Sequence, residues 1–430
     1  MEPNDRAIAS FTGLGHATFH AFELSIPVFV PVWLGAFDAS PTALGLAVGA
    51  GYALVGLLAP VAGGLADRFG SRRLVLLSGG GMGVAFAALS VVGSLAALAG
   101  VLALWGAAAS LYHPAGLSLI SRGAERRGRV LAYHGAGGNL GMVVGPLAAV
   151  LALVALGWRT VALLLTVPAA VCLLVGLFLR FEEDGAPAAD PDGSADGRPD
   201  ADADGRSDAD ADGRSAADGT GVGGALDTVR RFLASSRGLF VGGFVVVFGI
   251  QMVYGTYYRG VFTFLPDVLG GLAVLEPVTV GSRSVASGQL AYAGLLLVGV
   301  GGQYAGGVLS DRLDPERTLL GTFAALVVAS VLFVPASRTG VLPLLAVCAA
   351  LGLLVYVFPP VGQSLVAEYV PEGKHGLSFG YVYLGTFGVG ALGAAMAGAT
   401  LDLGGVPTLF SVLAGLALGC ALLTAALLAR

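Results

Sequence analysis

The segment "GGLADRFGSRR" (residues 63–73) has a weaker copy later in the chain, "GGVLSDRLDPER" (residues 306–317). When Gly63 is set against Gly307, the Asp-Arg pairs of the two segments coincide at an offset of 244 residues, 307 − 63. A second pair of segments, "RRGR" and "PEGK", matches at an offset of 245 residues, 373 − 128. Two independent matches at nearly the same offset predict two similar halves in parallel arrangement.

The composition places these halves in a membrane. Of 430 residues, 56% are hydrophobic and 12% are charged, and the mean hydropathy is +0.82, which is far above that of a soluble domain. Apolar runs of the roughly 20 residues that a bilayer-spanning helix needs recur along the chain. They cover residues 9–36, 42–66, 74–96, 98–121, 130–155, 158–180, 238–269, 285–309, 317–335, 340–366, 376–400 and 405–429. Because these runs lack the alternation of barrel strands, we expect an all-α membrane protein with twelve transmembrane helices in two six-helix halves.

The polar segments between the runs indicate domain boundaries and orientation. We expect an N-terminal half at residues 1–180, a linker at 181–237 and a C-terminal half at 238–430. Arginines concentrate in alternate loops, which by the positive-inside rule puts both termini in the cytoplasm of a cell-membrane protein. The acidic, Asp/Gly/Ala-rich linker is expected to be a disordered cytoplasmic tether, with a regulatory or partner-binding role as the alternative.

Several classes of site are disfavoured by the sequence. Cys172, Cys348 and Cys420 lie in apolar runs, without the spacing of a metal site or a redox pair. The chain has neither an HExxH arrangement nor a GxxxxGK[ST] loop, so a protease or an ATP-driven pump is poorly supported. We expect no enzyme activity, no cofactor, no resident metal and no nucleic-acid partner.

The segment at 63–73 resembles the loop signature of the major facilitator superfamily, G-x-L-x-D-R-x-G-R-R, with Ser71 in place of an arginine and Arg73 as its substitute. The resemblance covers every apolar run and implies a transporter whose substrate site lies between the halves. It also implies a monomer and a cytoplasmic network that latches one conformation. The latch residues would be Gly63, Asp67, Arg68, Gly70, Arg72, Arg73, Asp311 and Arg312.

A narrower resemblance is to the fosmidomycin-resistance group of drug efflux proteins. It rests on "GHATFH" (15–20), "LYHPAGLSLISR" (111–122), "GAGGNLGMVVGP" (135–146) and "RGVFTFLP" (259–266). The group usually has an aspartate where this chain has His20. The resemblance implies efflux of small molecules in exchange for protons.

The segment "GMVVGP" is also similar to the antiporter motif of the family's fifth span, through Gly141, Gly145 and Pro146. Ala148 and Ala149 stand where that motif has paired glycines. The resemblance implies an antiporter, and this departure weakens the match.

Three titratable residues interrupt the first apolar run. At about 100° per residue, His16, His20 and Glu23 fall on one helix face. An isolated charge at the bilayer centre costs about 2.5–3.5 kcal/mol on insertion scales, so exposure to lipid is disfavoured. We expect a water-filled cavity in which these residues exchange protons, because histidine titrates near neutral pH and a carboxylate can tune it. The alternative is that they only form hydrogen bonds across a helix interface.

The seventh run carries an arginine opposite this face, Arg259, when the two halves are aligned. Its guanidinium could hold an anionic substrate or pair with Glu23, and the sequence leaves both open. Other polar residues of the spans are further candidates for binding substrate. The candidate set is Arg259, Tyr254, Tyr257, Tyr258, Gln251, His113, His134, Asn139, Tyr356 and Gln363.

These observations predict a secondary transporter, with proton-coupled efflux of drug-like or anionic small molecules as the leading hypothesis. Its partners would be the substrate, protons and the lipid bilayer. One alternative keeps the fold and imports a metabolite anion. The other is an intramembrane metal-binding protein with His16, His20 and Glu23 as ligands at i, i+4 and i+7, a spacing that suits zinc or iron.

Overall fold

The structure is a computed structural model that describes residues 1–184, 237–240, 242–280, 283–370 and 375–430. Most of the expected linker, and with it the prediction of disorder, lies outside the described residues. Within them, nine helices are long and apolar enough to cross a membrane, and one bent helix pair makes a tenth. The predicted all-α membrane architecture is confirmed.

The N-terminal half consists of six spans, of which three are broken into two helices. Its helices are α1 (Pro3–Ala36), α2 (Pro41–Leu57), α3 (Ala59–Phe69), α4 (Ser71–Leu89), α5 (Leu95–Ala109), α6 (Tyr112–Gly123), α7 (Arg127–Leu153), α8 (Trp158–Leu164) and α9 (Val167–Phe178). The pairs α2 and α3, α5 and α6, and α8 and α9 each occupy one predicted apolar run. Helices α2 and α3 meet at a bend of 47°.

The C-terminal half repeats this plan. Its helices are α11 (Phe244–Gly270), α12 (Ser287–Ser310), α13 (Pro315–Thr339), α14 (Val341–Tyr369), α15 (His375–Tyr383), the π-helical turn η1 (Leu384–Val389) and α16 (Leu392–Leu428). Gly405, at φ +68°, interrupts α16, so α15, η1 and the first part of α16 form the eleventh span and the remainder forms the twelfth. Helix α11 is not among the helices counted above, and it carries several polar residues between Gln251 and Arg259.

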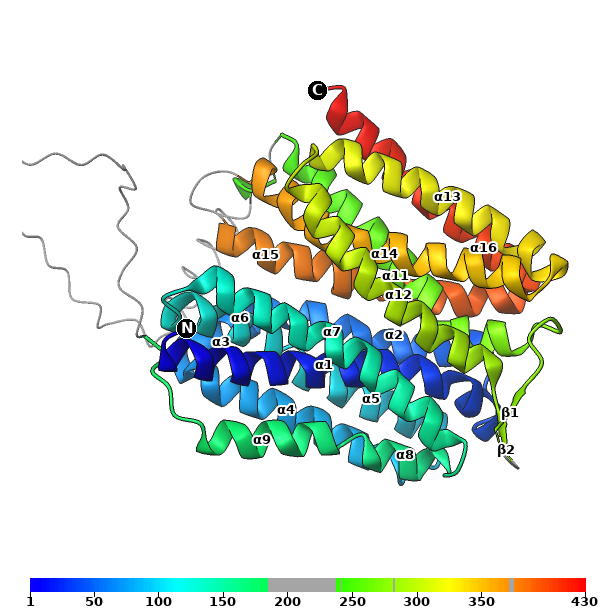
Figure 1. Ribbon diagram of the computed structural model, residues 1–430, viewed down its shortest axis with the longest axis horizontal. Coiled ribbons are helices and arrows are strands. Elements are labelled where there is room, and N and C mark those ends of the chain that lie inside the picture. The colour runs from blue at the N-terminus through cyan, green and yellow to red at the C-terminus, as the bar shows by residue number, and fades with distance from the viewer. Residues whose placement is uncertain (185–236, 241, 281–282, 371–374) are drawn as a thin grey trace, which may run out of the picture.

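A short hairpin that the sequence did not predict joins α11 to α12. Strand β1 (Val278–Val280) pairs antiparallel with β2 (Arg283–Val285), with Val278 opposite Val285. The hairpin lies at one end of the bundle, and we refer to that end as the hairpin end (Figure 1).

The two halves lie side by side, and the axes of their helices are roughly aligned (Figure 1). Within the halves, α1 packs on α7, and α11 packs on α16 in the same way. Between the halves, α1 meets α11, α7 meets α12, and α16 meets α2. These pairings exchange when one half is mapped onto the other, as expected for two copies of one plan around an axis between them.

Glycines set how closely α7 approaches α1. A Cβ on Gly141 would collide with the backbone of Ala17, and a Cβ on Gly145 would collide with Ala21. Helices in lipid associate through such small residues at four-residue spacing, because no hydrophobic effect drives them together there. The close crossing places the ring of His16 against Gly138 and His134 of α7.

Hydrogen bonds join the two halves near the hairpin end. On α12, the Nε2 of Gln289 donates a hydrogen bond to the carbonyl oxygen of Val28 at 3.0 Å, and the Tyr292 hydroxyl donates to that of Leu24 at 3.1 Å. At the start of α2, the amide of Thr42 donates to a carboxylate oxygen of Asp402 at 2.9 Å. The interface is therefore closed on the hairpin side of Glu23 in this conformation.

Candidate functional site

An ion pair between the two halves lies at the centre of the bundle. The guanidinium of Arg259 on α11 donates a hydrogen bond to Oε1 of Glu23 on α1. The side chains of Glu23 and Arg259 are only 1% and 2% exposed. A charge buried this deeply is tolerated when it is paired and hydrogen-bonded. The pairing that the sequence left open as one of two possibilities is therefore present in this conformation.

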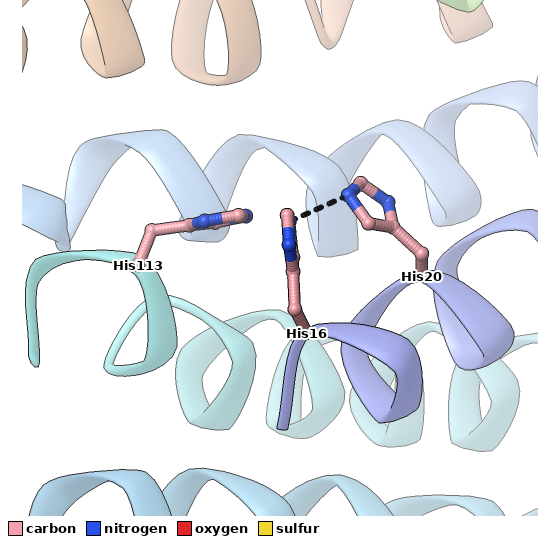
Figure 2. A group of neighbouring side chains, drawn as sticks. All are labelled: His16, His20 and His113. Atoms are coloured by element: carbon pink, nitrogen blue, oxygen red, sulfur yellow. Dashed lines mark hydrogen bonds between the residues drawn. The ribbon is translucent and has the colours of Figure 1, made fainter. Parts of the chain in front are cut away.

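The second oxygen of Glu23 begins a chain of contacts along α1. Oε2 lies 2.7 Å from Nδ1 of His20, and Nε2 of His20 lies 3.0 Å from Nε2 of His16. Nδ1 of His16 lies 2.9 Å from the backbone carbonyl oxygen of His134 on α7. Figure 2 shows the imidazole of His16 between those of His20 and His113. The three residues of the predicted helix face thus form one continuous hydrogen-bonded chain.

Aromatic rings enclose the Arg259 guanidinium. Its Cζ lies 3.7 Å from the ring centroid of Tyr52, 5.2 Å from that of Tyr258 and 5.4 Å from that of Phe387. The Tyr52 hydroxyl donates to the backbone oxygen of Glu23 at 3.1 Å. A desolvated cation over an aromatic face gains about 2 kcal/mol or more, so these rings stabilise the charge where water is excluded.

Two further histidines join the chain from neighbouring helices. The ring of His134 stacks on His16 with centroids 4.1 Å apart. The ring of His113 on α6 meets His16 edge-on at 5.2 Å and stacks against Tyr383 of α15 at 5.1 Å. Four of the five histidines of the chain therefore lie together on α1, α6 and α7, and His113 also contacts the C-terminal half.

Three of the predicted substrate-binding residues form hydrogen bonds within the C-terminal half. The hydroxyl of Tyr254 donates to the carbonyl oxygen of Val355 at 2.9 Å, and that of Tyr257 lies 2.9 Å from Oγ of Ser330. Gln251 accepts a hydrogen bond from Thr386 at 3.0 Å.

Tyr258 and Tyr356 do lie beside the ion pair. Their hydroxyl groups are 3.0 Å apart, and Tyr258 flanks Arg259. Asn139 on α7 is half-buried and Gln363 on α14 is exposed. Neither has a described hydrogen bond to the ion pair or to the histidines. Of the ten candidate substrate residues, five lie around the ion pair and the histidines, three form hydrogen bonds within the C-terminal half, and Asn139 and Gln363 lie apart from both groups.

The predicted latch lies at the end opposite the hairpin, next to the N-terminus (Figure 1). Asp67 is 3.7 Å from the guanidinium of Arg122 on α6, and Arg72 donates to the carbonyl oxygen of Gly176 at 2.7 Å. Gly70 turns the chain into α4 at φ +86°, a conformation that favours glycine. The network described at this position is confined to the N-terminal half.

The carboxylate at the start of α4 comes from a residue that the sequence did not single out. Oε2 of Glu183 accepts a hydrogen bond from the amide of Ser71 at 2.8 Å, where the positive end of the helix dipole favours an anion.

The remaining latch candidates are peripheral. Arg68 lies over the ring of Phe69 at 5.3 Å, Gly63 is half-buried, and Arg73, Asp311 and Arg312 are exposed.

The described residues bring one set of metal-ligating side chains together. One ring nitrogen each of His16, His20 and His113 lie within 4.8 Å of one another. Glu23, which the sequence placed in a possible metal site with His16 and His20, is not in this group, and its two oxygens contact Arg259 and His20. The third member comes from α6 instead.

Tyr52 is the main component of the site that sequence reasoning missed. It is the only aromatic residue in α2, whose other residues are almost all small or aliphatic. That isolation was the available signal. It was not decisive because a buried tyrosine can also serve only to pack, with its hydroxyl on a hydrogen-bond partner.

Comparisons with known proteins agree with this architecture. The family model for the Major Facilitator Superfamily matches residues 12–339 and 262–430. A curated relative, the uncharacterized MFS-type transporter YqjV of Bacillus subtilis (strain 168), is 35% identical over 130 residues, which are 29% of this chain and 31% of that protein. The chain thus aligns with about a third of the length of that relative.

Solved transporters share the fold over nearly the whole chain. The nucleoside transporter NupG superposes with a TM-score of 0.70 at 12% identity, covering 98% of this chain and 99% of that one. A D-xylose-proton symporter superposes with a TM-score of 0.71 at 12% identity, covering 98% and 97%. Likeness at these identities concerns the fold alone. With the family model matching both halves, this chain belongs to the Major Facilitator Superfamily of membrane transporters.

Proposed function

We propose that this transporter exports small, drug-like organic molecules in exchange for protons, by alternating access between its two halves. The observation that carries the proposal is the buried ion pair between Glu23 and Arg259, which joins the halves at the centre of the bundle. A carboxylate at this position is the group whose charge a proton can remove, and Arg259 is the group that responds to the change.

The hydrogen bonds along α1 support proton coupling. A carbonyl oxygen only accepts, so Nδ1 of His16 donates to His134, and a neutral His16 then has a bare Nε2. Nε2 of His20 must donate to it, which leaves a neutral His20 without a proton on Nδ1 for Glu23. The three observed contacts therefore require one more proton than two neutral histidines and an ionised Glu23 carry.

The cycle follows from this proton. With the site open to the outside, proton uptake neutralises Glu23 and weakens its hold on a cationic or polar cargo, which leaves. Reorientation exposes the site to the cytoplasm, where the proton departs and the carboxylate regains affinity for cargo. The protein would work in the cell membrane with both termini and the linker at 181–237 in the cytoplasm, between halves at 1–180 and 238–430.

One observation favours the alternative of anion import. Arg259 has Glu23 as its carboxylate partner, so protonation of Glu23 would free the guanidinium for an anionic cargo. Proton and anion would then bind together and move in the same direction. The sign of the coupling thus depends on the charge of the cargo.

Transport into proteoliposomes distinguishes the two functions. The full-length protein is reconstituted and its flux of cationic, neutral and anionic test compounds is measured with an imposed pH gradient of either sign. Export by exchange predicts accumulation on the acidic side, and import with protons predicts accumulation on the alkaline side. The Glu23→Gln variant fixes the side chain in a neutral state, so it should lose the response to the gradient under either function. Wild-type flux that ignores the gradient for every cargo would overturn proton coupling.

A further inference from the structure

His16 and His20 of α1 and His113 of α6 point their imidazole rings towards one another (Figure 2). One ring nitrogen of each lies within 4.8 Å of the others. In a tetrahedral zinc site with Zn–N bonds of about 2.0–2.1 Å, ligand nitrogens are about 3.3 Å apart. Small side-chain rotations would therefore bring all three nitrogens to one ion.

The rings of His16 and His20 have the hydrogen-bond partners that metal-binding histidines usually have. A ligating histidine donates its other ring N–H to a carbonyl or a carboxylate, which fixes the ring and makes the free nitrogen more basic. Nδ1 of His16 faces the carbonyl oxygen of His134 at 2.9 Å, and Nδ1 of His20 faces the Glu23 carboxylate at 2.7 Å. Both Nε2 atoms then offer lone pairs, 3.0 Å apart, to a shared cation.

The third ring supplies an independent observation. His113 is 7% exposed, and its Nε2 has no hydrogen-bond partner in the part of the chain that the structure describes. A buried polar atom without a partner is unfavourable. The edge-on approach of this ring to His16, at an interplanar angle of 86°, puts the unpartnered side chain beside the two Nε2 atoms.

We propose that His16, His20 and His113 bind a divalent transition-metal ion of the class that prefers imidazole nitrogen, with zinc as the reference ion. Three neutral imidazoles leave a fourth position for water, and Glu23 acts in the outer shell through His20 rather than as a ligand. The ion replaces the proton that His16 and His20 share, so binding releases that proton to solvent.

The site goes beyond the proposed transport function and does not depend on it. All three ligands belong to α1 and α6, within one half, so an ion can bind without any movement between the halves. Binding can therefore be measured directly on the purified protein, without transport.

The test titrates Zn²⁺ into full-length protein in detergent, purified through a tag without histidine and stripped with chelator. Calorimetry should give one ion per chain, and Co²⁺ should give the visible absorption of a tetrahedral nitrogen site. His113→Ala and His16→Ala should each weaken Zn²⁺ binding by at least about tenfold, because loss of even an outer-shell partner costs 10–100-fold. Affinity should fall on acidification, because protons compete for the same nitrogens.

The matched control is His375→Ala, which removes the fifth histidine of the chain, one that the proposal does not use, and it should leave Zn²⁺ affinity unchanged. His113→Gln, which keeps a polar side chain of similar size, replaces His113→Ala if the latter elutes as aggregate. Equal Zn²⁺ affinity in the wild type and the His113 variant, absence of binding to the wild type, or equal loss in the His375 variant would each overturn the proposal.

Discussion

Separating Glu23 from Arg259 should be costly, and the two single substitutions should differ. Both side chains are almost fully buried, and removing one partner of such a pair costs about 3–5 kcal/mol because the other charge is left uncompensated. Glu23→Gln leaves Arg259 without a carboxylate, and a guanidinium cannot lose its proton to escape. Arg259→Gln leaves Glu23 with His20 at 2.7 Å and with the option of taking up a proton. We therefore expect Glu23→Gln to be the more destabilising.

A double-mutant cycle measures the pairing itself. The free energy of unfolding is determined by denaturant titration for the wild type, Glu23→Gln, Arg259→Gln and the double variant. The double variant should be more stable than the sum of the single losses predicts, with a coupling energy of about 1.5 kcal/mol or more, as for close charge pairs. Tyr52, 3.7 Å from the guanidinium, adds to the loss in both Arg259 variants and cancels in the cycle.

The control cycle replaces Arg259→Gln with Arg159→Gln. The guanidinium of Arg159 lies over Trp158 at 4.4 Å and donates to the carbonyl oxygen of Val92 at 2.9 Å, without contact to Glu23. Its coupling to Glu23→Gln should be within about 0.5 kcal/mol of zero. A coupling that small for Arg259 as well would refute the pairing and, with it, the central role of this contact in the transport proposal.

Three further outcomes follow from the contacts. Gly141→Ala should lower the melting temperature strongly because its Cβ has no room against α1, whereas Gly135→Ala, with nothing within 4 Å, should leave it unchanged. Tyr52→Phe keeps the ring over Arg259 and loses one hydrogen bond, so it should cost about 1 kcal/mol of unfolding free energy. Glu183→Gln keeps an acceptor for the Ser71 amide and loses the negative charge at the start of α4, so it should cost about 0.3–1 kcal/mol, measured as a lower denaturation midpoint. Glu182→Gln is its control, because Glu182 contributes only backbone atoms to the hydrogen bonds there.

The sequence by itself determined the features that depend on local periodicity and on length. Each apolar run of about 20 residues became a helical span because the bilayer admits little else. The spacing of His16, His20 and Glu23 at i, i+4 and i+7 placed them on one helix face whatever α1 packed against. The repeated Asp-Arg segments predicted two matching halves, because each segment is a short pattern within one continuous stretch of chain.

Only the tertiary structure decided which side chains meet. Arg259 could have held a substrate or an acid, and its rotation towards Glu23 and Tyr52 depends on how α11 lies against α1 and α2. The same rotation directs Tyr257 to α13. His113 becomes the third imidazole only because α6 lies against α1. Such rotations are set by close contacts between residues far apart in the chain, as at Gly141 and Ala17, and no local pattern encodes them.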